Sequence, residues 1–238
     1  HLLPYGNMVF NAFGPESDIF TEAFAGGQIH ADVVMRACER ENLDDVGFGA
    51  QIWGKVEEGI ISQTQATLLV RALLSAGVDT TIIGIGNIVK VLASNPDAWA
   101  ALRKDRSLLR FAVDEALRLE SPFQKFHRTV TVDTVLGGVD IPAGSKLLVF
   151  LGAANRDPRR WGNDADTFNL DRNSSGHVAF GMGLHQCVGQ PIARLESEII
   201  LEQLLNTFET IELVGEPTPM AHNVLRGFTS IPVAVSTT

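Results

Sequence analysis

The chain has little cysteine: Cys38 and Cys187 are the two cysteines among its 238 residues. Small secreted domains that depend on disulfides carry many more, so the sequence excludes a disulfide framework and fits a reducing compartment. If one of these thiols binds a metal ion, the other is left without a role.

The chain also lacks an excess of positive charge and a long apolar run. Its net charge is −9, with both signs interspersed, so neither nucleic acid nor an anionic membrane is an expected partner. Residues 147–154 form one of the longest apolar runs, and this length suits a buried strand better than a membrane span. With 45% hydrophobic residues, the chain can bury the core of one large domain or two small ones.

The pattern of residues predicts a mainly α-helical fold with a small β component. The long helix expected over 62–95 begins at a capping box formed by Ser62 and Gln65, and its apolar residues recur with helical period. We therefore expect this helix to be central and largely buried. Further helices are expected over residues 18–24, 31–41, 97–104, 107–119 and 190–208.

Glycine and proline mark the breaks between these elements. Gly14-Pro15 and Gly26-Gly27 are expected to interrupt the helices near the N-terminus. β-Branched and aromatic residues separated by Gly137-Gly138 predict a small sheet within 125–151, and residues 211–235 predict a terminal strand pair.

The most informative stretch is a glycine-rich loop over residues 180–189 that presents Cys187 just before a strongly helical run. A helix that begins near Gln190 places its positive end beside the sulfur, which favours thiolate over thiol. A lone thiolate suits a single metal position. A zinc site built from His185 and Cys187 is disfavoured, because no cluster of cysteine or histidine nearby supplies the remaining ligands.

Several motifs together resemble the cytochrome P-450 superfamily of haem-thiolate monooxygenases, and its soluble bacterial members most closely. The pattern Phe-x-x-Gly-x-His-x-Cys-x-Gly over residues 180–189 is similar to the haem-ligand loop of that family. Chance would hardly supply the other motifs as well at compatible spacings. They are Ala76-Gly-Val-Asp-Thr-Thr81, Glu115-Ala-Leu-Arg118, Asn155-Arg-Asp-Pro158 and Phe168-Asn-Leu-Asp-Arg172.

The resemblance covers essentially the whole chain but begins in the middle of the family's fold. Residues 1–238 are therefore expected to be a C-terminal, haem-ligating portion of one larger catalytic domain. Lid-like helices would occupy residues 1–50 and the long oxygen-activation helix 62–95. Residues 107–238 would hold the Glu-x-x-Arg helix, the small sheet, the cysteine loop with its following helix, and the terminal strands.

The cofactor implied by the resemblance is haem b, iron protoporphyrin IX, with Cys187 as the axial ligand of the iron. His185 and Arg128 would bind the haem carboxylates, since a guanidinium fork suits a carboxylate well. A surface arginine on a strand is the alternative for Arg128. The residues expected to bind the cofactor are Cys187, His185, Arg128, Phe180, Gly181, Gly189, Ala76 and Gly77.

Asp79 and Thr80 resemble the acid and alcohol pair that steers protons to dioxygen in the family, and they are the expected catalytic residues. Gly77 shares a helix face with Thr80, and the two could form an oxygen-sized groove. The alternative is a helix kink in which the threonine hydroxyl bonds to the backbone.

The Glu-x-x-Arg pair, Glu115 and Arg118, lies on one face of its helix, and Arg172 matches the third member of the family's ion-pair cluster. Their implied role is structural. An isolated pair at a surface would be worth little. In the family pattern they are buried, and loss of one partner would cost about 3 to 5 kcal/mol.

Substrate contacts are implied for one arginine and for several side chains after the Glu-x-x-Arg helix. Arg71 lies among apolar neighbours and could pair with a carboxylated substrate, although such arginines also extend to the surface. The others are aromatic residues, which are commonly core residues, and one amide. The expected pocket residues are Arg71, Phe123, Gln124, Phe126 and Phe228.

The function implied is a cytoplasmic monooxygenase that hydroxylates or demethylates a small organic substrate. An aromatic carboxylic acid fits the resemblance, with O2 and electrons from a ferredoxin-type donor and its reductase. No membrane or nucleic-acid partner is expected. Two alternatives stay open: a shortened chain that does not hold haem and is inactive, or a haem-binding sensor without turnover.

Overall fold

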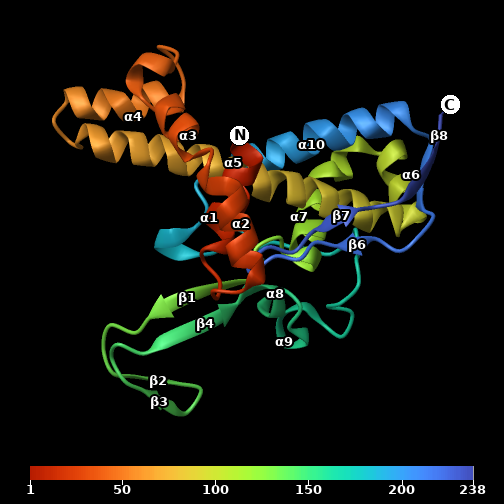
Figure 1. The fold of residues 1–238 in the computed structure, drawn as a ribbon. Coiled ribbons are helices and arrows are strands. Elements are labelled where there is room, and N and C mark those ends of the chain that lie inside the picture. Colours follow the sequence, from red (N-terminus) through yellow and green to blue (C-terminus); the bar gives the residue numbers. More distant parts are fainter. Residues whose placement is uncertain (238) are drawn as a thin grey trace. The chain divides into compact units, whose positions relative to one another are not determined.

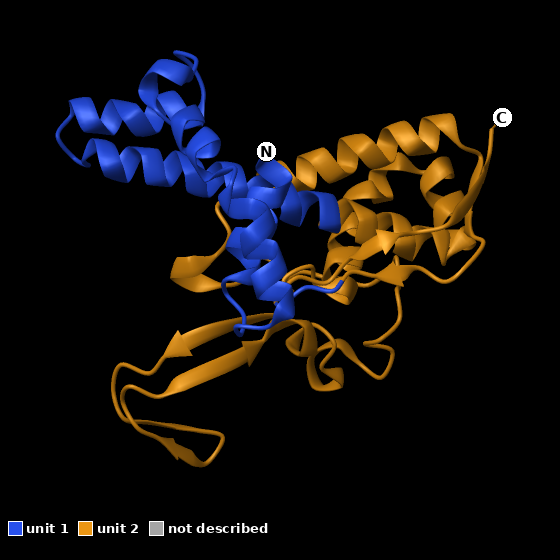
Figure 2. Ribbon diagram, in the orientation of Figure 1, with its two compact units in different colours: residues 1–83, 221–223 blue, residues 84–220, 224–238 orange. Residues whose placement is uncertain are grey.

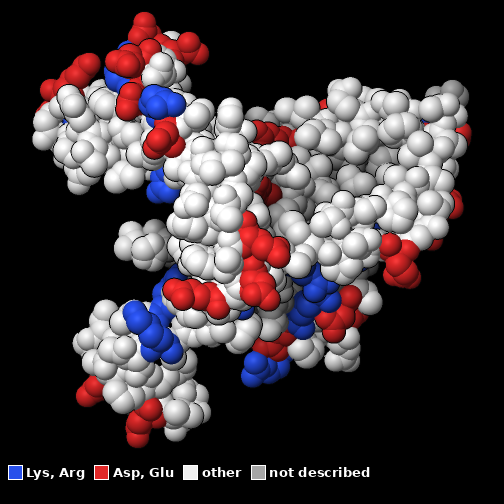
Figure 3. Space-filling view, in the orientation of Figure 1, with Lys and Arg blue, Asp and Glu red and all other residues white. Residues whose placement is uncertain are grey.

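The computed structural model describes residues 1–237 and is built from helices and short antiparallel strands (Figure 1). The expected mainly helical fold with a small β component is confirmed. Two compact units are distinguished in Figure 2: the first comprises residues 1–83 and 221–223, and the second comprises the rest of the described chain. Helix α5, Gln63–Ala93, runs through the boundary between Ile83 and Gly84. Acidic and basic side chains lie interspersed over the face shown in Figure 3.

The first unit is helical. Helix α2 begins at Ser17, whose hydroxyl accepts a hydrogen bond from the Phe20 amide at 3.4 Å, as an N-cap residue should. The helices of this unit are α1 (Leu2–Asn11), α2 (Asp18–Gln28), α3 (Ala31–Ala37), η1 (Arg40–Asn42), α4 (Phe48–Glu57) and the first part of α5.

Helix α2 continues through Gly26 and Gly27, so the predicted break at these glycines is wrong. A Cβ atom at Gly27 would overlap the Met8 side chain and lie 2.7 Å from the Pro4 carbonyl oxygen. Gly27 therefore allows α1 and α2 to pack closely, and it does not end the helix. Helices α1 and α4 themselves have no counterpart in the sequence-based prediction.

Helix α5 begins with the expected capping box. The Ser62 amide donates to the Gln65 side chain at 2.8 Å, and the Gln65 amide donates to the Ser62 hydroxyl at 3.2 Å. The expected burial is confirmed for most of one face of the second half, where Leu92 is fully buried, but the first half buries few residues, Ala66 and Val70 among them. In the first half, Leu69 is 47% and Leu73 is 38% exposed, because no described residue covers this face.

Among the described residues, α5 is the helix that is long and apolar enough to cross a membrane by length and composition alone. Helices from the core of soluble proteins pass the same test. Arg71 and Asp79 lie in its interior, and charged groups are costly inside a bilayer.

The second unit has a hydrophobic core between the end of α5 and helices α6, α7 and α10. Trp99, Leu102, Val113, Leu201 and Leu205 are almost completely buried in it. The Trp99 indole N–H also donates to the Glu209 carbonyl at 3.1 Å. The helices are α6 (Pro96–Lys104), η2 (Arg106–Leu108), α7 (Leu109–Glu120), α8 (Leu151–Ala154), α9 (Pro158–Trp161), η3 (Gly183–His185) and α10 (Gln190–Thr207).

The strands of the second unit form antiparallel two-stranded sheets, which is the small β component that the sequence predicts. Gly137 and Gly138 both have positive φ and make the tight turn between β2 and β3. The pairs are β1 (Lys125–Thr129) with β4 (Lys146–Phe150), β2 (Thr134–Leu136) with β3 (Val139–Ile141), β5 (Thr210–Leu213) with β8 (Val233–Ser236), and β6 (Thr218–Pro219) with β7 (Phe228–Ser230).

Candidate functional site

The cysteine loop of the second unit closes on itself through its backbone. The Cys187 amide donates to the Phe180 carbonyl at 2.8 Å. Gly181 and Gly183 have φ values of 71° and 72°, in the left-handed region that favours glycine. The loop can therefore turn tightly, and it leaves the Cys187 thiol exposed.

Helix α10 begins immediately after this thiol. Its N-cap residue is Gly189, which provides no side-chain cap, and the Gln190 amide donates to the Cys187 carbonyl at 3.5 Å. A Cβ atom at Gly189 would lie 3.8 Å from the Cys187 sulfur. The positive end of the helix dipole thus lies beside the sulfur and stabilises negative charge there.

Three charged or polar side chains support the loop from outside. His177 accepts a hydrogen bond from the Ala179 amide at 3.2 Å, and its Nε2 lies 3.5 Å from Asp114 on α7. Arg194 on α10 donates to Asp114 at 2.7 Å and stacks over the Phe180 ring at 4.6 Å. Burial opposes ionisation of Asp114, but the bonds from His177 and Arg194 outweigh it and hold its pKa below the ordinary value.

Asp114 and Arg194 were not found from the sequence. They belong to no motif, and their partners are 63 and 80 residues apart in the chain. Only the packing of α7 against α10 brings them to the loop.

The Glu-x-x-Arg pair forms a buried ion cluster with Arg172. Arg118 donates to both Glu115 oxygens at 2.8 and 2.9 Å, and Arg172 donates to Glu115 at 3.0 Å. Glu115 and Arg118 have no exposed side-chain surface. Ser174 adds a further hydrogen bond to Glu115 at 2.7 Å. The structure therefore brings the three predicted residues together.

This cluster holds the long connection that leads to the cysteine loop. Arg118 donates to the Asn155 carbonyl at 2.5 Å and the Ala165 carbonyl at 2.8 Å. The buried Asn155 side chain in turn accepts from the Val178 amide at 2.7 Å. The connection is thus tied to α7 just before Phe180.

The predicted oxygen-activation residues lie on α5 in the first unit. The Thr80 hydroxyl donates to the Ala76 carbonyl at 2.7 Å, which is the local backbone bond that the alternative interpretation expects. A Cβ atom at Gly77 would meet nothing within 4 Å. The helix surface at Gly77 is therefore open, as a groove for a small ligand requires.

Asp79, next to this surface, is an unusual carboxyl group. Its Oδ2 is buried and has no hydrogen-bond partner among the described residues. Burial raises the pKa of Asp79 from 3.8 to about 6. A carboxyl group with a pKa near neutrality can both hold and release a proton at physiological pH.

Arg71 lies two turns before Asp79 on the same helix. Its Nε is buried and makes no hydrogen bond within the described part of the chain. The Arg71 charge opposes the effect of burial on Cys38, whose pKa burial nevertheless raises. A buried guanidinium N–H without an acceptor is suited to an anionic ligand.

The other predicted pocket residues lie in the second unit. The rings of Phe123 and Phe126 stack in parallel with centroids 4.0 Å apart. Gln124 donates to the Glu120 and Ser121 carbonyls, so its amide N–H groups cap α7. Lys90 lies over the Phe228 ring with its Nζ 5.9 Å from the centroid.

The two residues predicted to bind haem carboxylates are both exposed. Arg128 lies on β1, where its guanidinium donates to the His127 carbonyl at 2.9 Å and covers the Phe126 ring at 5.6 Å. His185 ends η3 in the cysteine loop. The structure thus leaves both side chains accessible to a ligand.

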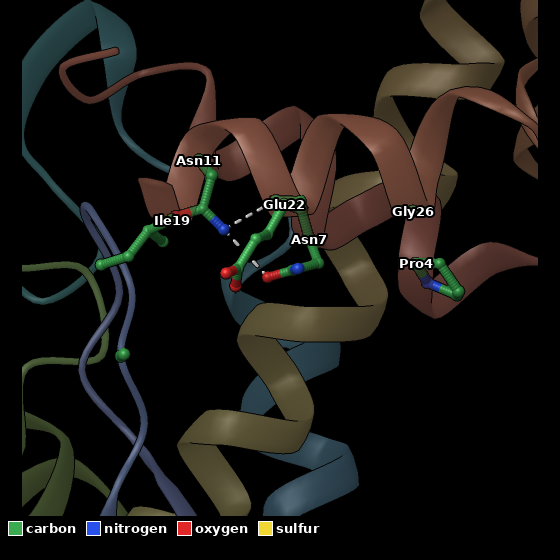
Figure 4. Close-up of a pocket in the computed structure, with 8 residues that line it drawn as sticks. Pro4, Asn7, Asn11, Ile19, Glu22 and Gly26 are labelled. Atoms are coloured by element: carbon green, nitrogen blue, oxygen red, sulfur yellow. Dashed lines mark hydrogen bonds between the residues drawn. The ribbon is translucent and has the colours of Figure 1, made fainter. Parts of the chain in front are cut away.

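The predicted residues therefore form two groups, one in each unit. Ala76, Gly77, Asp79, Thr80 and Arg71 belong to the first, and the remaining predicted residues belong to the second. The hollow between α1 and α2, with Pro4, Asn7 and Glu22 on its wall, contains none of them (Figure 4).

The donor set at Cys187 fits a haem iron. Among residues 1–237, no group of three or more His, Cys, Asp or Glu side chains could hold a metal ion. The described residues therefore do not form a multi-ligand metal cluster around Cys187, and a metal held there by the thiol would take further ligands from a macrocycle such as haem. The exposed thiol, the helix start without a side-chain cap and the glycine turns of the loop all fit such a group.

Comparison with known proteins decides the family. The cytochrome P450 family model matches residues 50–235. The chain belongs to the cytochrome P450 family. P450 proteins bind haem b, which agrees with the single thiolate described above.

The P450 chain is similar to several bacterial relatives. It is 48% identical to cytochrome P450 CYP199A2 of Rhodopseudomonas palustris over 236 residues, which are 99% of this chain and 57% of the relative. It is 41% identical to beta-dihydromenaquinone-9 omega-hydroxylase of Mycobacterium tuberculosis over 180 residues, 76% of this chain and 37% of the relative. The chain thus spans less than two thirds of these curated P450 relatives.

The P450 fold is also found in solved structures. The structure of cytochrome P450 CREJ matches with a TM-score of 0.89 at 27% identity, covering 99% of this chain and 60% of that one.

Proposed function

We propose that the chain is the haem-ligating part of a monooxygenase that inserts one oxygen atom of O2 into a small organic substrate. Electrons from a redox partner and protons reduce the other oxygen atom to water. The exposed Cys187 thiol at the uncapped start of α10 carries this proposal. An exposed thiol beside the positive end of a helix supports the binding of a metal by its thiolate form.

Cys187 would hold the iron, and the loop backbone would keep the thiol in place. When bound, the haem supplies the activation of O2, and thiolate ligation favours cleavage of the O–O bond. His185 and Arg128 are proposed to bind its carboxylates. Phe180, held by Arg194 at 4.6 Å, would shield the thiolate from water.

Asp79 and Thr80 are proposed to handle protons. The raised pKa of Asp79 lets it give up a proton near neutral pH, and the Thr80 hydroxyl can pass one on by exchanging its bond to the Ala76 carbonyl. Ala76 and Gly77 leave space beside them for a small reactant. Their function is positioning and proton transfer, while the cofactor supplies the oxidising chemistry.

The proposed substrate class is an aromatic carboxylic acid, hydroxylated or demethylated by the enzyme. The Arg71 Nε, which has no hydrogen-bond partner among the described residues, supports a substrate with an anionic group. The stacked Phe123 and Phe126 rings support a substrate with an aromatic group. Phe228 and Gln124 complete the proposed pocket residues. A solved P450 neighbour, cytochrome P450 CREJ, is in complex with (4-ethylphenyl) dihydrogen phosphate, which is also an aryl group with an anionic end.

Replacing Arg71 by glutamine is expected to raise the Kd of an aromatic acid about 10- to 100-fold, because a hydrogen bond to a charged group is worth about 1.5 to 3 kcal/mol. The methyl ester of the same acid should bind equally well to both proteins. Arg71→Lys should restore part of the affinity. Spectral titration of the haem-loaded protein measures all of these constants, and an equal loss for acid and ester would contradict the assignment.

The proposed electron donor is a ferredoxin-type protein with its reductase, docking on the cysteine side. Met182, Leu184 and Val188 around Cys187 are 68%, 96% and 79% exposed and could form the apolar part of that contact. A cytoplasmic location, without membrane or nucleic-acid partners, is proposed from the bacterial relatives and from the net charge of −9.

The test of the proposed function is the carbon monoxide spectrum of the reduced, haem-supplied chain. A strongly red-shifted Soret band is expected, because thiolate ligation produces it. A band typical of histidine ligation would exclude Cys187 as the ligand. Absence of haem absorbance would show that this chain does not hold the cofactor by itself. A red-shifted band without product in the presence of donor, O2 and substrate would favour a sensor.

A further inference from the structure

Helix α1 lies directly against the Asp79 carboxyl at a glycine. A Cβ atom built on Gly6 would lie 2.9 Å from Asp79 Cγ and 3.3 Å from Oδ1, and it would overlap Oδ2. Gly6 is buried within α1. Any residue larger than glycine at this position would displace the carboxyl group.

A glycine inside a helix lowers helix stability relative to alanine, so Gly6 is unfavourable for α1 by itself. The contact with Asp79 supplies a packing reason for it. Gly26 in α2 provides a comparison, because it lines the hollow of Figure 4 and a Cβ there would meet nothing within 4 Å.

The surroundings of Asp79 contain little that could ionise. Helix α1 carries a single titratable side chain, Tyr5. On α5, Arg71 precedes Asp79 by eight positions, which is about 12 Å along the helix axis. His222, in the other segment of the unit, has its pKa lowered to about 4 by burial and stays neutral above that pH. Burial is the single cause that raises the pKa of Asp79.

We infer that Gly6 is a positioning residue: through it the bare backbone of α1 covers the Asp79 carboxyl and controls when that group holds a proton. This inference rests on the proposed role of Asp79 in proton transfer. While α1 covers the carboxyl, Asp79 keeps its proton up to a pH of about 6, so that it can donate the proton near neutral pH. Without this cover, water would solvate the oxygen atoms and the carboxyl would release its proton at lower pH.

The variant Gly6→Ala tests this inference. Its methyl group meets the end of a flexible side chain, so the protein should fold while the carboxyl turns toward solvent. The pKa of Asp79 is then expected to fall toward 3.8. Gly26→Ala, which adds the same methyl group to the neighbouring helix, should leave the pKa unchanged.

The measurement is the difference in unfolding free energy between each protein and its Asp79→Asn counterpart, as a function of pH and without haem. A raised pKa means that the folded protein binds more protons, so this contribution is present below pH 3.8 and is lost as the pH rises to about 6. In Gly6→Ala the contribution of Asp79 to the free energy of unfolding should be lost at a lower pH than in the unmodified protein. An unchanged profile in Gly6→Ala, or the same change in Gly26→Ala, would overturn the inference.

A second measurement separates this inference from the proposed function. In the haem-loaded enzyme, Asp79→Asn and Thr80→Ala should form less product per electron consumed. Gly6→Ala should also lower this ratio, with a pH dependence shifted from that of the unmodified protein. Normal product yield in Asp79→Asn would contradict the role of Asp79 in catalysis, whereas the titration alone decides whether Gly6 controls its proton.

Discussion

Replacing Glu115 by glutamine is expected to lower the free energy of unfolding by about 3 to 5 kcal/mol. The substitution keeps the shape of the side chain and removes its charge. Two arginines would then lose the negative charge of Glu115. Arg118 has no exposed side-chain surface, and the side chain of Arg172 is 10% exposed. Since whole domains are stable by about 5 to 15 kcal/mol, this loss removes a large part of the total.

The loss should be visible as a lower urea midpoint, followed by circular dichroism. Glu202→Gln, which changes an exposed residue of α10 in the same way, is the control and should change stability by less than about 0.5 kcal/mol. Equal midpoints for the Glu115 variant and the control would show that the buried cluster does not stabilise the fold.

The Glu115 variant should also affect the cysteine loop. The cluster ties the connection at Asn155 to α7, and Asn155 holds the Val178 amide two residues before Phe180. Limited proteolysis between residues 155 and 186 should therefore become faster in the variant than in Glu202→Gln.

Replacing Cys187 by alanine is expected to abolish the red-shifted carbon monoxide band and, with it, the proposed monooxygenase activity. The other cysteine of the chain, Cys38, belongs to the first unit and is buried. Since Cys187 is exposed, its loss should leave the circular dichroism spectrum and the urea midpoint of the haem-free chain unchanged.

Cys38→Ala is the matched control. It removes the other cysteine, the C-cap residue of α3, whose thiol donates to the Val34 carbonyl at 3.1 Å and has no part in the proposed site. This variant should keep the red-shifted band even if burial makes it less stable. A red-shifted band that persists in Cys187→Ala and disappears in Cys38→Ala would refute Cys187 as the iron ligand.

Local signals in the sequence predicted many elements correctly. The capping box at Ser62 and Gln65 marks the start of α5 because the two residues satisfy each other's backbone amides without help from the rest of the chain. The turn at Gly137 and Gly138 is also local, because both glycines adopt the positive φ that it requires. The spacing of Glu115 and Arg118 within one helix face is also a local property.

The sequence-based predictions are wrong where the structure depends on contacts between residues far apart in the chain. Gly26 and Gly27 have the composition of a break, but Gly27 packs against α1 inside a continuous helix. The first half of α5 has the apolar pattern of a buried helix, although Leu69 and Leu73 remain exposed among the described residues. The composition and the period of apolar residues do not show which face of a helix is covered by another element.

The sequence by itself predicted the family and the type of fold correctly, and it is the source of the proposal that Cys187 is the thiolate. The motif around Cys187 is contiguous, and the chemistry of one thiol before a helix follows from its neighbours in the chain. The tertiary structure alone decided that Asp114 and Arg194 support the loop, that Arg172 and Ser174 complete the charge cluster, and that Gly6 covers Asp79. These contacts join residues many positions apart, so they exist only once helices pack, and burial then sets the energy of each charge.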